Sequence, residues 1–226
     1  MIGNSVPLGL LGSTTSLSFD PIQSWGIIDR IVSLDTNYKM TQPTNTYFTS
    51  DTHWSHKNIP KFCPDTRRGE TIEEMNELLI EGWNTTVPKN GIVYHIGDFS
   101  FGKTVEEIKS VVERLNGEIH LILGNHDFLI RKTPELRALF ASVHDYKRIS
   151  LNKTDIILCH FPIARWDKMH VGSIHFHGHT HGKYQCEGRG VDVGIDARPD
   201  NRMLPWKYEE LYEIAMARPV ITDGGD

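Results

Sequence analysis

Short apolar runs alternate with segments of helical periodicity along most of the chain. The runs are rich in Val, Ile, Phe and Tyr, have the length of strands, and lie at 47–50, 92–96, 119–123, 155–159, 173–177 and 191–194. Apolar residues recur every three or four positions at 72–83 and 105–115, which predicts two helices. A short helix is expected from Thr133-Pro134, and a last helix from Pro205 to just before Pro219. The alternation predicts an α/β sandwich with functional groups on loops beyond the carboxyl ends of the strands.

Each of the two longer helices is preceded by a capping signal. Thr71 with Glu74, and Thr104 with Glu107, have the spacing in which the Thr hydroxyl accepts a backbone N–H of the first helical turn. We therefore expect the two helices to begin directly after these threonines. Gly117 is expected to end the second helix.

The first 39 residues differ from the rest of the chain. Residues 1–19 carry no charged side chain, and their apolar stretch at 6–12 is interrupted by Pro7 and Gly9. The stretch is too short and too interrupted to span a membrane, and no Lys or Arg precedes it as in a secretory signal. We expect 1–39 to be a loosely attached N-terminal extension, or upstream translated sequence, and Met40 to begin one domain covering 40–226.

Net charge and cysteine usage limit which partners and metals the protein is expected to bind. The formal net charge is −5, so the sequence indicates no broad basic surface; binding to duplex nucleic acid is not expected, although a small nucleotide remains open. The three cysteines, Cys63, Cys159 and Cys186, are odd in number and widely spaced, which argues against a disulfide framework or a thiolate zinc site. A reducing, cytoplasmic setting fits this usage best.

Five segments rich in His, Asp and Asn follow the predicted strands in order. They are Asp51-Thr52-His53, Gly97-Asp98, Gly124-Asn125-His126-Asp127, His160 and Gly178-His179-Thr180-His181. Because loops beyond strand carboxyl ends meet at one edge of a sheet, these side chains are expected to converge. Carboxylate and imidazole ligands without thiolate suit two divalent ions, with Mn expected and Fe, Ni, Co or Zn as alternatives. One carboxylate must bridge ions about 4 Å apart, and Asp98, alone after its strand, is the natural bridge.

The ordered set D-x-H, G-D, G-N-H-D, H and G-H-x-H resembles the calcineurin-like metallophosphoesterase superfamily over about residues 46–200. Residues 50–59 and 95–102 further resemble a compact bacterial and phage branch. The resemblance implies a β-sandwich of two mainly mixed sheets flanked by helices. It implies that one metal is held by Asp51, His53, Asp98 and His181, and the other by Asp98, Asn125, His160 and His179. His126 would be the acid that protonates the leaving oxygen, and Asp127 would orient its imidazole.

Departures from better-known branches of the superfamily indicate the reaction class. Its protein Ser/Thr phosphatases continue Gly-Asp into Asp-Arg-Gly and carry Glu after Gly-Asn-His, whereas this chain has 99–102 as Phe-Ser-Phe-Gly and then Asp127. The missing Arg argues for hydrolysis of a compact phosphodiester, such as a nucleotide or cyclic nucleotide, by a hydroxide that bridges the metals. Two alternatives stay open: a monoesterase or nuclease with the same metals, and a binding subunit that has lost catalysis.

Substrate contacts are harder to assign from sequence. His56 and Arg165 follow ligand segments closely and are candidates to bind phosphate oxygens, together with Asn125. A solvated surface charge explains His56 and Arg165 equally well. Trp54 and Phe101 are candidates to stack on a nucleobase or to cover the sheet edge. The sequence does not decide the oligomeric state.

Overall fold

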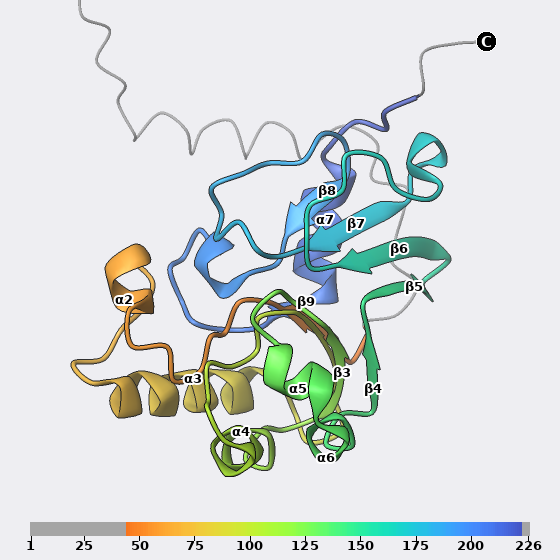
Figure 1. Ribbon diagram of the computed structural model, residues 1–226. Coiled ribbons are helices and arrows are strands. Elements are labelled where there is room, and N and C mark those ends of the chain that lie inside the picture. The colour runs from red at the N-terminus through yellow and green to blue at the C-terminus, as the bar shows by residue number, and fades with distance from the viewer. Residues whose placement is uncertain (1–43, 223–226) are drawn as a thin grey trace, which may run out of the picture. The chain divides into compact units, whose positions relative to one another are not determined.

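The computed structural model describes residues 44–222, so the predicted extension 1–39 and its boundary at Met40 lie outside the described residues. The described part is built on two mixed sheets flanked by helices, as the sequence predicted (Figure 1). The first sheet contains, in order, β4 (Ser142–His144), β3 (Glu118–Ile122), β2 (Ile92–Ile96), β1 (Thr46–Thr49) and β9 (Trp206–Lys207). The second contains β5 (Tyr146–Leu151), β6 (Thr154–Cys159), β7 (Ile174–His177) and β8 (Gly190–Asp192).

Most strand pairs are parallel, and each sheet carries one antiparallel strand at an edge. In the first sheet β1 to β4 are parallel, and β9 pairs antiparallel with β1. In the second sheet β6, β7 and β8 are parallel, and β5 pairs antiparallel with β6. The carboxyl ends of the parallel strands within each sheet therefore lie at one edge, which is where loops carry function in α/β folds.

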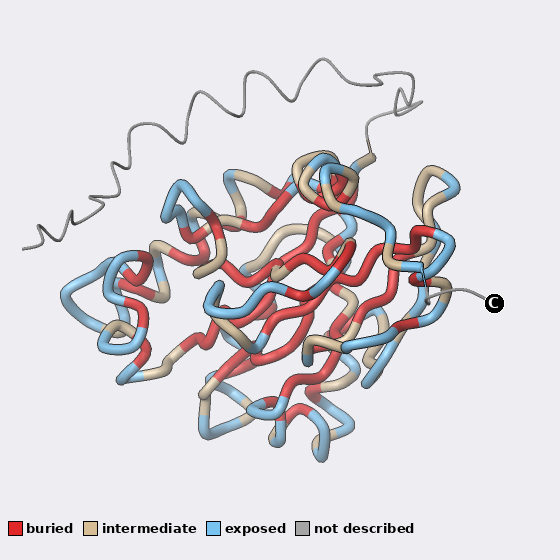
Figure 2. Tube along the Cα trace, turned by 90° about the horizontal axis from the view of Figure 1, so that it is seen from above, coloured by how far each residue is buried: buried red, intermediate tan, exposed pale blue. Residues whose placement is uncertain are grey.

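Strand β1 is buried on both faces, and β2 and β3 are buried toward their carboxyl ends, which explains why these strands read as apolar runs. Successive side chains of β1 point to opposite faces. Phe48 faces the second sheet, where it meets Phe176 of β7 edge-on with 4.8 Å between ring centroids. Tyr47 faces the other way and joins the core under the helices. Figure 2 shows the buried segments concentrated along the strands and the exposed ones in the connections.

Helices cover the outer face of the first sheet. They are α3 (Ile72–Thr86), α4 (Val105–Val112), α5 (Phe128–Lys132) and α6 (Pro134–Arg137) (Figure 1). Both predicted caps are present, since Thr71 Oγ1 accepts the N–H of Glu74 at 3.1 Å and Thr104 Oγ1 accepts that of Glu107 at 3.2 Å. A short helix, α2 (Ile59–Phe62), follows the first ligand segment, and α7 (Tyr208–Met216) contacts β8, β9 and β1.

The structure corrects several predicted elements. The last helix does not begin at Pro205, because residues 206 and 207 pair with β1 as β9 and α7 starts at Tyr208. The strand expected at 191–194 ends at Asp192. The strands β4, β5 and β9 and the helices α2 and α5 were not predicted. Residues of β5 alternate between exposed and half-buried, and half of them are polar, so this strand lacks a continuous apolar run. No helix within residues 44–222 is long and apolar enough to cross a membrane.

Candidate metal centre

Five loops bring the predicted ligands together at the carboxyl ends of β1, β2, β3, β6 and β7. Backbone contacts hold these loops against one another across the two sheets. Asp51 N donates to Gly97 O at 3.0 Å, Gly178 N donates to His160 O at 3.0 Å, and Ser50 forms a parallel bridge with Gly194. The convergence that was expected from the position of each segment after its strand is therefore present.

The backbone of the ligand loops adopts an uncommon conformation. Five of the seven predicted metal ligands have positive φ, a region that non-glycine residues rarely occupy: Asp51 (55°), His53 (50°), Asp98 (55°), His179 (70°) and His181 (50°). Each such residue costs about 1 kcal/mol or more and persists only where its surroundings determine it. Left-handed residues directly after a strand reverse the chain sharply, which allows two ligands of one loop to share a site.

One group of donors consists of Asp51, His53 and His181, whose ligand atoms lie within 4.8 Å of one another. His53 Nε2 lies 3.7 Å from Asp51 Oδ1, and His181 Nε2 lies 4.0 Å from the same oxygen. His53 and His181 face each other with 5.2 Å between ring centroids. These spacings are typical of atoms that surround a common cation without bonding to one another.

A second group consists of Asp98, His160 and His179. His160 Nε2 lies 3.4 Å from Asp98 Oδ2 and 3.1 Å from Asn125 Oδ1. His160 Nδ1 lies 2.8 Å from the carbonyl oxygen of Ile96, which fixes the proton on Nδ1 and leaves Nε2 to face the two oxygens. The lone pairs of His160 Nε2, Asp98 Oδ2 and Asn125 Oδ1 then face one another. Because lone pairs repel, a proton or a metal ion must lie among them.

Asp98 joins the two groups. Its Oδ2 lies 3.4 Å from His160 Nε2 of the second group and 3.8 Å from His53 Nε2 of the first. Its Oδ1 accepts the backbone N–H of His126 at 2.8 Å, which holds the carboxylate in this position. The side chain is 3% exposed, so a cation near it would be poorly screened by water.

His53 gives the test of whether the residues fit a metal. Both of its ring nitrogens are buried without a hydrogen-bond partner among the described residues. Burial lowers the pKa of His53 to about 2, so the ring is neutral and offers a lone pair. A buried polar atom without a partner destabilises a fold by about 1–3 kcal/mol, and coordination of a divalent ion by Nε2 would supply the missing interaction there. The donor set of nitrogen and carboxylate oxygen suits such an ion.

The charges of the site are strongly coupled. Burial raises the pKa of Asp51 to about 7, although His160 and His181 oppose the shift. Burial would also raise the pKa of Asp98, but the hydrogen bond and charge of His160 lower it to about 2. The pKa of His160 is raised to about 9 because its interactions with Asp98 and Asp51 outweigh the effect of burial. Without a metal the site therefore keeps protons between its oxygen and nitrogen donors, and a cation bound there would replace them.

His126 lies beside these donors without being one of them. Its side chain is 46% exposed, and its Nε2 lies 3.9 Å from Asp98 Oδ2. Its ring packs against Phe101 with 4.6 Å between centroids and against His53 with 5.7 Å. The imidazole is therefore next to the donor groups and still reachable from solvent.

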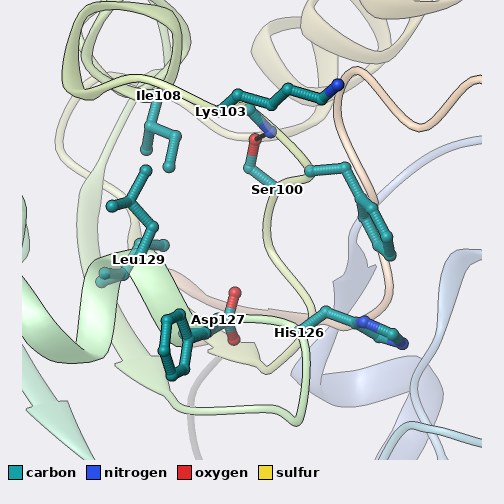
Figure 3. A pocket seen from close by; sticks show the side chains of 10 residues that line it. Ser100, Lys103, Ile108, His126, Asp127 and Leu129 are labelled. Carbon is teal, nitrogen blue, oxygen red and sulfur yellow. Dashed lines mark hydrogen bonds between the residues drawn. The ribbon is translucent and has the colours of Figure 1, made fainter.

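The contacts of Asp127 differ from the predicted orientation of His126. Asp127 Oδ2 accepts the N–H groups of Asp98 and Gly124, and Oδ1 accepts that of Phe99, each at 2.8 Å. No contact within residues 44–222 joins this carboxylate to the His126 ring, and Figure 3 shows the two side chains leaving the loop in different directions. Burial raises the pKa of Asp127 to about 6, with the N–H of Gly124 acting against the rise. Asp127 thus fixes the backbone that carries Asp98.

Comparison with known proteins agrees with this geometry. The family model described as calcineurin-like phosphoesterase matches residues 44–153, which contain the first three ligand segments. Uncharacterized protein MJ1445 of Methanocaldococcus jannaschii is 35% identical over 142 residues, which cover 62% of this chain and 72% of that protein. The chain belongs to the calcineurin-like phosphoesterase family. The family implies phosphoester hydrolysis with divalent metal ions.

Other relatives of this phosphoesterase extend the match along the chain. The Gene 66 protein of Mycobacterium phage L5 is 30% identical over 201 residues, which cover 76% of this chain and 94% of that protein. A crystal structure of a protein of unknown function from Aquifex aeolicus has a TM-score of 0.57 at 23% identity and covers 75% of this chain and 98% of its own. That structure shares the fold.

Two residues that the sequence analysis did not single out, Arg67 and Asp196, hold the first donor group of the phosphoesterase in place. Asp196 Oδ2 lies 2.7 Å from His181 Nδ1, so that His181 Nε2 is left to face Asp51. Arg67 donates to both oxygens of Asp196, at 2.9 Å from Nε and 2.6 Å from Nη2. The same guanidinium donates to the carbonyl oxygens of Asp51, at 2.5 Å, and Thr52, at 2.8 Å. Arg67 therefore ties the Asp51–His53 loop to the loop that carries His181.

Contacts among Arg67, Asp196, His181 and Cys63 determine which of these side chains are charged. Burial would lower the pKa of His181, but its hydrogen bonds with Asp196 and Cys63 raise it to about 10. Burial would raise the pKa of Asp196, but His181 and Arg67 hold it far below its usual range. Cys63 Sγ lies 3.7 Å from His181 Nδ1, which Asp196 already occupies at a shorter distance. In the sequence, Arg67 is simply a basic residue after the first ligand segment, and nothing there indicates its contacts with Asp196.

Residues predicted to contact substrate lie in different surroundings. His56 is half-buried, its ring packs 3.9 Å from that of Phe101, and burial lowers its pKa. Arg165 is exposed, and its guanidinium pairs with Glu187 at 3.2 Å. Trp54 is fully buried against Phe99 within the apolar core, so it cannot stack on a nucleobase. The substrate-binding roles of His56, Arg165 and Asn125 stay predictions.

Proposed function

We propose that this protein hydrolyses small phosphodiesters with two divalent metal ions, Mn being the first candidate, bound at the Asp98 centre. The position of Asp98 between the two donor groups carries the proposal, because one carboxylate shared by two ions is what a dinuclear site requires. Each ion would be held by four residues: Asp51, His53, Asp98 and His181 for one, and Asp98, Asn125, His160 and His179 for the other. Bound ions supply positive charge to the phosphate and lower the pKa of a water that attacks it.

His126 is proposed to donate the proton that the departing alcohol needs. An alkoxide leaves slowly at neutral pH unless a nearby acid protonates it, and an imidazolium is suited to that task. The His126 ring borders the donor groups and is not a member of either, so its Nε2 is available to a substrate oxygen. Its backbone N–H holds Asp98 Oδ1, which ties the position of the acid to that of the shared carboxylate.

The cationic groups near the site favour a diester over a monoester. At neutral pH a monoester carries about one more negative charge than a diester and is served by side chains that bind phosphate oxygens in pairs. The Arg67 guanidinium reaches the first ligand loop but is bound to Asp196 and to two backbone carbonyl oxygens. His56 has a lowered pKa and adds little positive charge at neutral pH. The singly charged phosphodiester therefore suits the site better.

The test is hydrolysis of bis-p-nitrophenyl phosphate by metal-stripped protein reloaded with Mn, compared with His126→Ala, Asp98→Asn and the exposed control His170→Ala. We expect turnover to require metal and to fall by about 100-fold or more in the first two variants, with His170→Ala unchanged. Bound metal measured by mass spectrometry should fall in Asp98→Asn and stay near wild type in His126→Ala.

Other outcomes of this assay point to the alternatives. Faster turnover of p-nitrophenyl phosphate than of the diester would indicate a monoesterase, and cleavage of single-stranded oligonucleotides as the best substrate would indicate a nuclease. Bound metal without turnover of any of these compounds would contradict the proposal and indicate a binding role.

A further inference from the structure

A hollow of about 340 Å³ opens beside His126, on the side facing α4 and α5 (Figure 3). Most of its wall is apolar and comes from Phe101, Phe128, Leu129, Ile108 and Ile130. The polar side chains at its border are Ser100, Lys103, His126 and Asp127. Its volume is near the lower end of the range of small-ligand sites, about 300–1,000 Å³.

We propose that this hollow receives the alcohol portion that leaves the phosphorus, and that it favours an aromatic alcohol bearing a negatively charged group. The inference rests on the proposed function, because it takes His126 as the acid. The inference specifies the chemical class of the alcohol that leaves during hydrolysis at the same site.

The position of His126 indicates which portion of the substrate would enter the hollow. An acid that protonates the leaving oxygen must lie within hydrogen-bond reach of it, so the leaving portion extends from the phosphate past His126. His126 is one of the residues that line the hollow, together with residues of α4 and α5. A second hollow, lined by Phe62, Cys63 and His181, borders a predicted metal ligand instead and contains no candidate acid. The first hollow therefore borders the candidate acid His126, and the second borders the predicted metal ligand His181.

The walls favour a flat aromatic group. Phe101 packs against the His126 ring with 4.6 Å between centroids, which places an aromatic surface directly beside the acid. Phe128 is 60% exposed, so much of its ring surface is open to a ligand. The ammonium of Lys132 lies 3.8 Å from the centroid of the Phe128 ring and helps to hold it in place. Two rings and three aliphatic side chains together offer apolar surface to an aryl ring or a nucleobase.

The charges at the border favour a negative substituent. Lys103 is exposed, and no hydrogen bond or ion pair of its ammonium group is found within residues 44–222; the Glu107 carboxylate beside it accepts its backbone N–H at 2.6 Å. Asp127 is the one carboxylate among the described lining residues, and it is buried and bound by three backbone N–H groups. Lys103 at the border and Lys132 over Phe128 are the cationic side chains near the hollow, and the exposed Glu107 carboxylate lies beside the backbone of Lys103.

Two chromogenic diesters test the inference: methyl 4-nitrophenyl phosphate and methyl 3-carboxy-4-nitrophenyl phosphate, whose leaving phenols differ by one carboxylate. The quantity measured is the ratio of kcat/KM for the carboxylated to the plain ester. We expect Lys103→Gln to lower this ratio by about 3-fold, the scale of one exposed ion pair, and Lys183→Gln, which borders the second hollow, to leave it unchanged. Because each ratio is compared with that of the wild type, the intrinsic reactivity of the esters cancels.

A binding measurement keeps the inference separate from catalysis. The free phenol 3-carboxy-4-nitrophenol is titrated into metal-free protein by calorimetry, so the result does not depend on turnover. We expect its affinity to fall about 3-fold or more in Lys103→Gln and in Phe128→Ala, the scale of one lost aromatic or ionic contact. Phe62→Ala is the matched control, because Phe62 is 61% exposed and borders the second hollow.

The outcomes distinguish the two proposals. Unchanged ratios and unchanged phenol affinity in Lys103→Gln and Phe128→Ala would overturn the inference while leaving the phosphodiesterase proposal in place. Equal losses in the Phe62 and Lys183 controls would overturn it as well, since the effect would then not belong to this hollow. Absence of turnover on both esters with bound metal would contradict the proposed function, and the phenol titration would still decide whether the hollow binds the leaving group.

Discussion

Replacing Asp196 with Asn removes one buried negative charge between Arg67 and His181 and leaves the side-chain size unchanged. The Asp196 side chain is 2% exposed, and its carboxylate contacts His181 Nδ1, Thr66 Oγ1 and the guanidinium of Arg67. An amide offers a single oxygen in place of two and presents N–H groups to a site filled with donors. At least one of these hydrogen bonds must therefore be lost, and the buried guanidinium loses its counter-charge.

Two effects of different kind follow. Loss of one partner of a buried ion pair destabilises a protein by about 3–5 kcal/mol, and the lower end, about 3 kcal/mol, is expected because Arg67 keeps two carbonyl acceptors. His181 also loses the carboxylate that fixes its Nδ1 proton and makes Nε2 a stronger ligand. Loss of such a partner lowers metal affinity by about 10- to 100-fold.

The stability effect is measured by urea unfolding of metal-free protein, and the metal effect by competition for Mn with a fluorescent chelator. Asp200→Asn is the matched control, since Asp200 contacts Arg198 and Arg202 at 3.0 and 2.7 Å, is one-third exposed and touches no predicted ligand. It should change stability by less than about 1 kcal/mol and leave Mn affinity unchanged. In a double-mutant cycle, adding Arg67→Met to Asp196→Asn should cost less than the sum of the single changes by about 1–3 kcal/mol, because the uncompensated charge is gone.

The reasoning is refuted if Asp196→Asn binds Mn as tightly as the wild type. It is equally refuted if the Asp200 control loses as much affinity, because the loss would then not come through His181. An additive double-mutant cycle would show that Arg67 and Asp196 stabilise the protein separately.

Two further predictions concern buried groups outside the donor sets. Asp127→Asn should lower the unfolding free energy by about 1–3 kcal/mol, because its amide cannot accept the three backbone N–H bonds that the carboxylate accepts. A pH profile of kcat that stays unchanged in this variant would separate this role from orientation of the acid. Burial lowers the pKa of His95 to about 3, so the stability gained from its neutral folded form is fully present above about pH 6.5 and is lost as the pH falls toward 3. Urea unfolding of metal-free protein at several pH values should show a shallower fall in His95→Gln, by up to about 1.4 kcal/mol per pH unit; an unchanged slope would mean that His95 is protonated in the folded state.

The elements that the sequence predicted are those whose signals are local. The caps at Thr71 and Thr104 depend on a residue three positions away, and both are present. The strand β1 is buried throughout and β2 and β3 are buried toward their carboxyl ends, so all three stand out as apolar runs. In contrast, β9 is two residues long and exists because it pairs with β1, which is distant in sequence, so no local pattern could reveal it.

The same distinction applies to the site. The donor residues were recognisable because their types, their order and their place after strands are all local properties. Arg67 acts through Asp196, which is 129 residues away, and a basic residue in a polar segment is ordinarily a surface residue. The family resemblance implied that Asp127 orients the His126 imidazole, but its carboxylate accepts no hydrogen bond from that ring within residues 44–222. The carboxylate turns instead toward the backbone of Asp98, Phe99 and Gly124.

The features that make the centre suitable for cations are ones that oppose stability when no cation is bound. Left-handed backbone at the ligands, a buried imidazole that makes no hydrogen bond within residues 44–222, and two buried carboxylates close together all destabilise a folded chain. They are confined to loops at the strand ends, whereas most of the apolar core lies under the helices and between the sheets. Several destabilising features thus occur together at one edge of a fold that otherwise follows the rules of stable packing. Such a concentration is typical of a functional site. Arg67, Asp196 and Asp127 are the residues through which the fold holds these loops in place.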